Sequence, residues 1–239
     1  MSKKVYALLT GRGNNTLPNK NIRDILGKPT LYYAANAAKK VSLIDDFFCS
    51  SDDEKILCEA EKLGYKKINR PLELALPTSQ HVDAIIHALN EMKKECETPD
   101  LLVVMLANNV TVKAKWIEDC LNIANQSDDI TSVVPVYVEN DHHPYRAKSL
   151  DKNGDLQMFV PLENEISTNR QDLPDCYFLA HNFWVLNVKN LLSNSKGQQP
   201  WAFMGDKIKP YIINESIDIH EEKDFLLAKL WIEEEYDSL

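Results

Sequence analysis

The 239-residue sequence has no long apolar run, no paired-cysteine motif and no internal repeat. A membrane-spanning helix needs roughly 18 or more apolar residues in a row, and no segment approaches that length. Residues 1–9 are too poor in apolar residues to form a secretory signal. The five cysteines are scattered without CxxC spacing, and an odd number is typical of reduced thiols. We therefore expect a soluble cytoplasmic protein that does not contact a membrane.

Positive charge is also scarce, and the net charge is −9. A nucleic-acid-binding surface needs clustered Lys and Arg to displace counterions, so we expect no nucleic-acid partner. The cations gather at the start of the chain, where residues 1–28 carry six of them against one acid, Asp24. A basic start suits a small polyanionic ligand, whereas the acidic tail from Glu215 onward suits a metal ion or simple solvation.

Short apolar runs alternate with amphipathic segments along a single domain, residues 1–239. This alternation predicts an α/β fold with a doubly wound, mainly parallel, Rossmann-like sheet. Strands are expected at residues 5–9, 47–49, 66–69, 101–106, 130–138, 177–188 and 211–213. Helices are expected after Pro29, after a capping box at Ser51, after a cap at Thr78 or Ser79, around Trp116 and from about Glu221.

Residues 139–175 break this rhythm. The stretch is polar and contains Pro144, Gly154, Pro161 and Pro174. We interpret it as an inserted arm that mediates dimerisation, and we expect a homodimer.

The candidate site begins where the first strand ends, in residues 10–21. In an open α/β sheet, ligands bind outside the carboxyl ends of the strands. Gly11 and Gly13 let backbone N–H groups approach an anion, and Arg12 and Lys20 add full positive charges. The loop is neither a Walker A loop nor a GxGxxG fingerprint, so a nucleoside triphosphate bound in another way is indicated.

This loop resembles the first loop of the CMP-sugar synthetases, the acylneuraminate and related cytidylyltransferases. Arg12 is followed by Leu17-Pro18 and by Lys20-Asn21-Ile22, as in that family. Further motifs follow in the family's order over nearly the whole chain: Ser-Asp-Asp-Glu at 51–54, Arg-Pro-Leu-Glu-Leu-Ala at 70–75, His-His-Pro at 142–144, Arg-Gln-Asp-Leu-Pro at 170–174 and Ser-Ile-Asp-Ile at 216–219.

The resemblance implies a nucleotidyltransferase that moves CMP from CTP to an acidic sugar, sialic-acid-like or another ulosonic acid, and releases pyrophosphate. The sugar's anomeric hydroxyl would attack the α-phosphorus in line, without a covalent enzyme intermediate. Arg12, Lys20 and Asp218 are the implied catalytic residues, and Asp218 with His220 the implied ligands of Mg²⁺. The implied nucleotide-binding residues are Gly11, Arg12, Gly13, Lys20, Asn21, Arg70, His81 and Asn108, and the implied sugar-binding residues are Arg146, Arg170 and Asn182.

The sequence departs from the family pattern in the loops that would touch the nucleotide. Residues 14–16 replace a segment that often supplies a phosphate-binding lysine. Residues 106–111 lack a glutamine of the nucleotide pocket, for which Asn108 or Asn109 can substitute. The pair Gln80-His81 stands where the family has small serines.

The family's Asp-x-Asp motif becomes Asp218-Ile219-His220 here. An imidazole in place of a carboxylate weakens the preference for Mg²⁺ and favours Mn²⁺. Asp83, Glu221 and Glu222 are possible substitutes, and His220 can equally be an ordinary residue at a helix start.

Two other functions are also consistent with the sequence. A nucleotide-sugar-dependent glycosyltransferase also combines an α/β sheet with an Asp-x-Asp metal site, although usually in mid-chain. A non-catalytic nucleotide-binding protein would be consistent with the loss of the second metal ligand.

Overall fold

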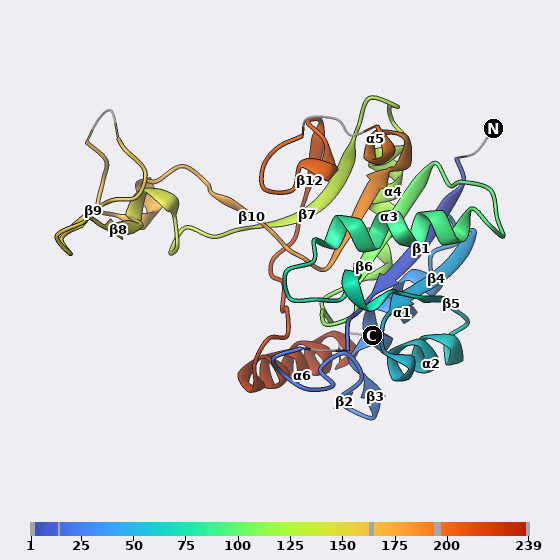
Figure 1. Ribbon diagram of the computed structural model, residues 1–239. Coiled ribbons are helices and arrows are strands. Elements are labelled where there is room, and N and C mark those ends of the chain that lie inside the picture. The colour runs from blue at the N-terminus through green and yellow to red at the C-terminus, as the bar shows by residue number, and fades with distance from the viewer. Residues whose placement is uncertain (1–2, 14, 163–164, 194–196, 238–239) are drawn as a thin grey trace.

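The computed structural model describes residues 3–13, 15–162, 165–193 and 197–237. Its centre is an eight-stranded sheet with the strand order β10-β7-β11-β6-β1-β4-β5, to which β12 adds by pairing with β7 (Figure 1). The bounds of these strands are β1 (Val5–Thr10), β4 (Asp46–Ser51), β5 (Lys66–Asn69), β6 (Leu101–Leu106), β7 (Ser132–Val138), β10 (Tyr177–Leu179), β11 (Phe183–Asn187) and β12 (Ile208–Ile212).

Strand β1 pairs in parallel with β4 and β6, β4 with β5, and β12 with β7, whereas β10 and β11 run antiparallel to their neighbours. The mainly parallel sheet predicted from the sequence is therefore confirmed.

Helices cover both faces of this sheet, because successive strand residues bury side chains on opposite sides. Val5 and Leu9 of β1 face α1 (Leu31–Lys39), α2 (Glu54–Lys62) and α4 (Ala114–Ala124). Tyr6 and Leu8 face α3 (His81–Met92) and α5 (Val188–Leu192). The doubly wound arrangement follows from this alternation.

The C-terminal helix α6 (Glu222–Asp237) packs outside the two layers. It buries Phe225, Ala228 and Ile232 against Ile25 and Tyr33. Ile25 belongs to a small ribbon made by β2 (Asp24–Ile25) and β3 (Lys28–Pro29). Within the described part of the chain, no helix is both long and apolar enough to cross a membrane.

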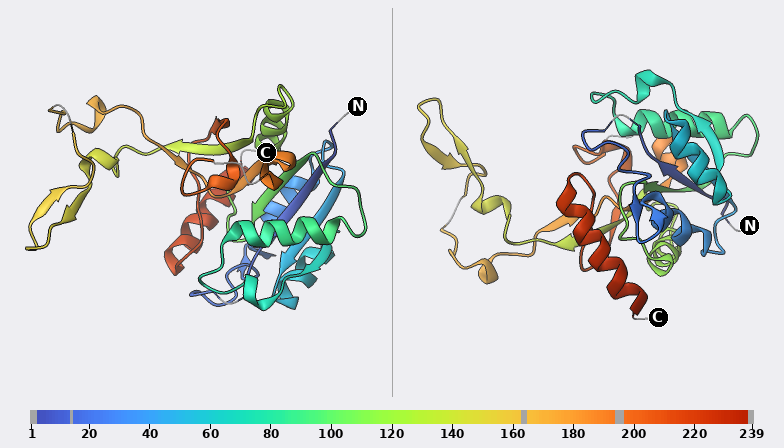
Figure 2. Two further views of the ribbon diagram at one scale, coloured as in Figure 1. Left: turned by 45° about the horizontal axis from the view of Figure 1, so that its top comes forward. Right: turned by 90° about the horizontal axis from the view of Figure 1, so that it is seen from below.

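The described residues of the segment 139–175, which are 139–162 and 165–175, leave the body between β7 and β10 and extend away from it (Figures 1 and 2). This arm carries a separate ribbon of β8 (Lys148–Leu150) and β9 (Leu156–Met158), and the 3₁₀ helices η2 (Pro144–Arg146) and η3 (Arg170–Asp172). Two further 3₁₀ helices, η1 (Leu72–Leu74) and η4 (Ala202–Met204), lie in loops of the body.

Three local predictions were wrong in detail. The expected strand at 177–188 is two strands, because His181 has a left-handed φ of 48° between β10 and β11. Helix α3 follows Gln80 without a side-chain cap, and the Ser79 hydroxyl donates instead to the carbonyl of Glu73 at 2.7 Å. Helix α2 is capped by Asp53, since Ser51 is still part of β4.

Candidate active site

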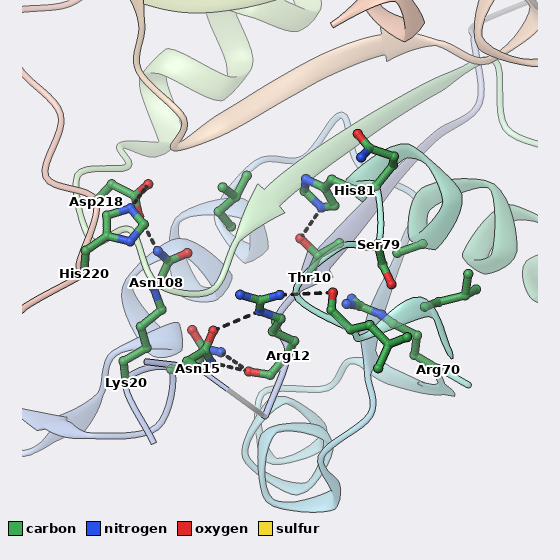
Figure 3. Close-up of a pocket in the computed structure, with 17 residues that line it drawn as sticks. Thr10, Arg12, Asn15, Lys20, Arg70, Ser79, His81, Asn108, Asp218 and His220 are labelled. Carbon is green, nitrogen blue, oxygen red and sulfur yellow. Dashed lines mark hydrogen bonds and ion pairs between the residues drawn. The ribbon is translucent and has the colours of Figure 1, made fainter. Parts of the chain in front are cut away.

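A cavity of about 260 Å³ opens where the winding of the sheet reverses beside β1 (Figure 3). From β1 the chain continues to β4 and β5 on one side, and β6 then pairs with the other edge of β1. The carboxyl ends of β1 and β6 therefore face a common crevice, the usual ligand site of such sheets. Nine of the residues predicted from the sequence line it: Gly11, Arg12, Lys20, Asn21, Arg70, His81, Asn108, Asp218 and His220.

Arg12 is held at the floor of the cavity by the turn that follows β1. Its Nε donates to Asn15 Oδ1 at 3.3 Å, and its Nη1 donates to the carbonyl of Leu76 at 3.2 Å. The Asn21 amide in turn donates to the carbonyl of Arg12 at 2.9 Å. Asn15 belongs to the divergent segment 14–16, and the sequence did not mark it as a site residue; Asn14 is outside the described residues. The direction of the guanidinium is thus set by Asn15 of this turn and by Leu76 of the segment before α3.

Lys20 connects the first turn to the C-terminal part of the chain. Its side chain is only 7% exposed, and its Nζ donates to the carbonyl of Ile219 at 2.6 Å. Asn19, with a φ of 57°, turns the backbone so that Lys20 points inward. Burial lowers the pKa of Lys20 below its usual value, while the nearby carboxylate of Asp218 acts in the opposite direction. An ammonium has three N–H groups, and Ile219 accepts from one of them, so the others can donate to an anionic ligand in the cavity.

Asp218 reaches the cavity from the segment between β12 and α6. Asn108 Nδ2 donates to Asp218 Oδ1, and His220 Nε2 lies 2.9 Å from Asp218 Oδ2. The backbone N–H of Ile219 donates to the carbonyl of Asn108 at 3.0 Å, which joins this segment to the end of β6. The Asn108 amide is therefore directed at the carboxylate and orients it.

The opposite end of the cavity is less charged. Arg70 is 8% exposed, and its Nε and Nη2 donate to Ser50 at 3.2 Å and 2.7 Å. His81, the first residue of α3, has its Nε2 2.9 Å from Thr10 Oγ1. Apolar side chains complete this end: Leu74, Leu76 and Ala84. Arg12, whose Nη1 bonds to the Leu76 carbonyl, lies between this end and the end that carries Lys20 and Asp218 (Figure 3). The cavity therefore has a polar end suited to phosphates and a drier end suited to a planar base, with Arg12 between them.

The backbone N–H groups of Gly11 and Gly13, predicted to face an anion, bond to other parts of the protein. The N–H of Gly11 donates to the carbonyl of Ser50 at 3.3 Å, and that of Gly13 to Asp52 Oδ1 at 3.0 Å. Gly13 lies outside the cavity lining, and a Cβ there would come within 2.7 Å of Asp53 Cβ. Both N–H groups are therefore occupied within the protein, and Gly13 is required for close packing of the turn.

Asn182, predicted as a sugar-binding residue, is buried in the sheet and does not line the cavity. It is 0% exposed; its Nδ2 donates to the carbonyl of Thr111 at 2.9 Å, and its Oδ1 accepts from the N–H of Phe183 at 2.7 Å. Both polar ends of the amide are thus used inside the sheet.

Arg146 and Arg170 lie in the arm and do not line the cavity of their own chain. Arg170 Nη1 contacts both carboxylate oxygens of Asp141, at 3.0 Å and 2.9 Å. Arg146 Nη1 donates to the main-chain carbonyl of Asp141 at 3.3 Å. Arg146 Nη1 also lies 3.9 Å from Asp141 Oδ1, so two cations share one carboxylate on an exposed part of the arm.

His181 is a further residue at this edge that the sequence did not reveal. Its ring packs against Trp184 and Trp201, with centroids 6.0 Å and 5.1 Å apart. Burial lowers the pKa of His181, and Asp218 acts against that shift. No local signal distinguishes this histidine, because its surroundings come from distant segments.

Comparison with solved structures agrees with this fold. The chain resembles the solved structure of a CMP:2-keto-3-deoxy-manno-octonic acid synthetase complexed with CTP, with a TM-score of 0.69 at 13% identity over 97% of this chain and 99% of that one. It also resembles a 4-diphosphocytidyl-2C-methyl-D-erythritol synthase from Anaerococcus prevotii, with a TM-score of 0.65 at 14% identity over 97% of each chain.

Sequence comparison assigns the family. A CMP-N,N'-diacetyllegionaminic acid synthase of Legionella pneumophila is 24% identical over 99% of both chains. A pseudaminic acid cytidylyltransferase of Campylobacter jejuni is 27% identical over 72% of this chain and 73% of that protein. Residues 12–184 match the cytidylyltransferase family, and the chain belongs to it. The predicted CMP-sugar synthetase resemblance and enzyme class are therefore confirmed.

Proposed function

We propose that this enzyme transfers CMP from CTP to an acidic sugar of the ulosonic acid class and releases pyrophosphate. The observation that supports this most is the convergence of Arg12, Lys20 and Asp218 on one cavity. Two cations suit a triphosphate, and the carboxylate suits the ion that accompanies it. The relatives named above, which act on legionaminic and pseudaminic acid, favour the same acceptor class.

The chain's own residues act by positioning and charge. Arg12 and Lys20 hold the phosphates and offset the negative charge that moves onto the pyrophosphate leaving group. Arg70 and His81 hold the base at the drier end, which places the α-phosphorus between the two ends of the cavity. The sugar's anomeric hydroxyl attacks there in line with the departing pyrophosphate.

Asp218 is the residue we propose to hold Mg²⁺. Among the described residues, no three His, Cys, Asp or Glu side chains form a metal-binding group. A single carboxylate fits an ion that takes its other ligands from phosphate oxygens and water, as Mg²⁺ does. The ion would neutralise phosphate charge. His220, whose Nε2 is 2.9 Å from Asp218 Oδ2, would add a nitrogen ligand of the kind that suits Mn²⁺.

We further propose a cytoplasmic homodimer in which the arm covers part of the partner. The ribbon of β8 and β9 exposes Leu150, Leu156, Met158 and Phe159, and a lone two-stranded ribbon is marginally stable in water. The Arg146–Asp141–Arg170 group carries a net positive charge. A partner's cavity would use this charge to bind the sugar carboxylate.

Pyrophosphate release tests the reaction. The protein is incubated with CTP, Mg²⁺ or Mn²⁺, and a panel of sialic, legionaminic, pseudaminic and 3-deoxy-manno-octulosonic acids. Pyrophosphate formed only when CTP and a sugar acid are both present supports the proposal. Consumption of a ready-made CMP-sugar would indicate a glycosyltransferase instead, and CTP binding without turnover would indicate a non-catalytic homologue.

A further inference from the structure

The two contacts of the Thr10 hydroxyl indicate which nitrogen of the His81 imidazole carries the hydrogen. Thr10 is the last residue of β1 and is 5% exposed. Its hydroxyl donates to the carbonyl of Met105 at 3.2 Å and lies 2.9 Å from His81 Nε2. A hydroxyl has one hydrogen to donate, so both contacts are hydrogen bonds only if His81 Nε2–H donates to Thr10 Oγ1. His81 Nδ1 is then a lone pair, which can only accept.

The ring stays neutral, so this lone pair persists at physiological pH. Burial lowers the pKa of His81 to about 4, and the charges of Arg70 and His181 act in the same direction. A neutral imidazole has one donor and one acceptor, and here the donor is already used. Among the described residues, none donates a hydrogen bond to His81 Nδ1. The free acceptor belongs to a ring that lines the cavity (Figure 3).

Arg70 provides donors at the same end of the cavity. Its Nε and Nη2 are engaged with Ser50, and a guanidinium has further N–H groups for a ligand. The hydroxyl and the main-chain carbonyl of Ser50 in β4 hold the Arg70 guanidinium in place. A planar ligand between Leu74 and Ala84 would therefore meet a fixed donor and a fixed acceptor.

This donor and acceptor pair distinguishes the two common pyrimidines. Cytosine presents an exocyclic amine, which is a donor, whereas uracil presents a carbonyl oxygen at the same position. The His81 lone pair would accept from the amine of cytosine but would face the lone pairs of the uracil oxygen. Specificity of this kind depends on the repulsive contact as much as on the attractive one.

We propose that His81 is a specificity-determining residue that accepts a hydrogen bond from the cytosine amino group through Nδ1 and so rejects uracil. Thr10 is the positioning residue that holds His81 in this tautomer. The inference rests on the proposed function and deepens it, because it assigns base selection to one named side chain of the cavity.

Thr10 variants test the tautomer without removing the ring. Thr10→Val keeps the shape of the side chain but removes the hydroxyl, so nothing holds the hydrogen on Nε2 and His81 can adopt the tautomer protonated on Nδ1. Thr10→Ser keeps the hydroxyl and is the matched control. By calorimetry, the ratio of the UTP to the CTP dissociation constant should fall about tenfold in Thr10→Val and be retained in Thr10→Ser, since one hydrogen bond accounts for about a factor of ten.

Two further measurements test the role of His81 if the Thr10→Val variant does not fold. His81→Phe keeps a ring of similar size without the lone pair, and its UTP to CTP ratio should fall by about the same factor. In the wild-type protein, nitrogen-15 NMR of His81 at pH 7 should report hydrogen on Nε2 and a bare Nδ1. Hydrogen on Nδ1, a wild-type protein that binds CTP and UTP equally, or ratios unchanged in Thr10→Val and His81→Phe would each overturn the inference.

The same measurements distinguish a wrong role for His81 from a wrong reaction for the enzyme. If the variants lose the preference for CTP over UTP, but the wild-type protein forms no pyrophosphate from CTP with any sugar acid, then the proposed reaction is wrong and the role of His81 stands. If pyrophosphate is released from CTP while the variants keep the wild-type ratio, then the reaction stands and the role of His81 is wrong.

Discussion

The Lys20 ammonium donates to the carbonyl of Ile219 at 2.6 Å, across 199 positions of sequence. This bond attaches the turn after β1 to the segment that carries Asp218. It brings a buried cation and a carboxylate to one wall of the cavity, although they come from opposite ends of the chain. The charge arrangement of the site therefore depends on the docking of the C-terminal segment.

Replacement of Lys20 should reduce catalysis more than stability. Lys20→Met removes a charge that offsets the leaving pyrophosphate, and we expect kcat/KM for CTP to fall about 100-fold. The free energy of unfolding should fall by about 1 kcal/mol, because one hydrogen bond to Ile219 is lost. Lys62→Met, on the exposed side of α2, is the control and should match wild type in both measurements. Equal kcat/KM in the two variants would contradict a phosphate-binding role.

The metal preference should depend on His220. His220→Asp introduces a second carboxylate two residues after Asp218, and oxygen ligands favour Mg²⁺ over Mn²⁺. We expect the ratio of the rate with Mg²⁺ to the rate with Mn²⁺ to rise several-fold, measured by pyrophosphate release at saturating CTP. His142→Asp makes the same charge change on an exposed arm residue and should leave this ratio unchanged. A ratio that is identical in wild type and His220→Asp would exclude His220 as a ligand.

Acid should destabilise the protein through His81. In the unfolded chain His81 titrates near 6.5, whereas burial lowers its pKa to about 4 in the folded protein. Between these values the unfolded state binds more protons, so stability is full above pH 6.5 and is lost as the pH falls toward 4. From pH 7 to pH 5 this group should cost about 2 kcal/mol.

Urea unfolding at pH 7 and pH 5 measures this loss. His81→Phe cannot take up the proton, so its stability should fall by about 2 kcal/mol less than that of wild type over the same interval. His181, whose pKa is also lowered by burial, is present in both proteins and cancels in the difference. An equal loss in the two proteins would show that His81 is not buried as described.

The arm should control the oligomeric state. Leu156→Glu together with Phe159→Glu places two charges on exposed apolar positions of the arm, and burial of unpaired charge at an interface is costly. Sedimentation equilibrium should show a dimer for wild type and a monomer for this variant, with loss of pyrophosphate release. Lys152→Glu, at the exposed turn between β8 and β9, is the control and should remain dimeric. A wild-type monomer with full activity would refute the dimer.

The sequence alone determined the parts of this protein that depend on local pattern. Alternating apolar residues predicted most of the strands and helices, since hydrophobic periodicity reports which side of an element is buried. The cationic turn with Arg12 and Lys20 and the downstream motifs also identified the enzyme class. Each of these signals is contained in a few neighbouring residues.

Tertiary contacts decided what each side chain can do. The amide of Asn182 is hydrogen-bonded inside the sheet. The N–H groups of Gly11 and Gly13 donate to β4 and to the loop that follows it. The amide of Asn108 orients the carboxylate of Asp218. The tautomer of His81 depends on Thr10, which lies 71 positions away in sequence. Hydrogen-bond partners and burial come from segments that meet only after folding, so no local pattern specifies whether a polar group is free for a ligand.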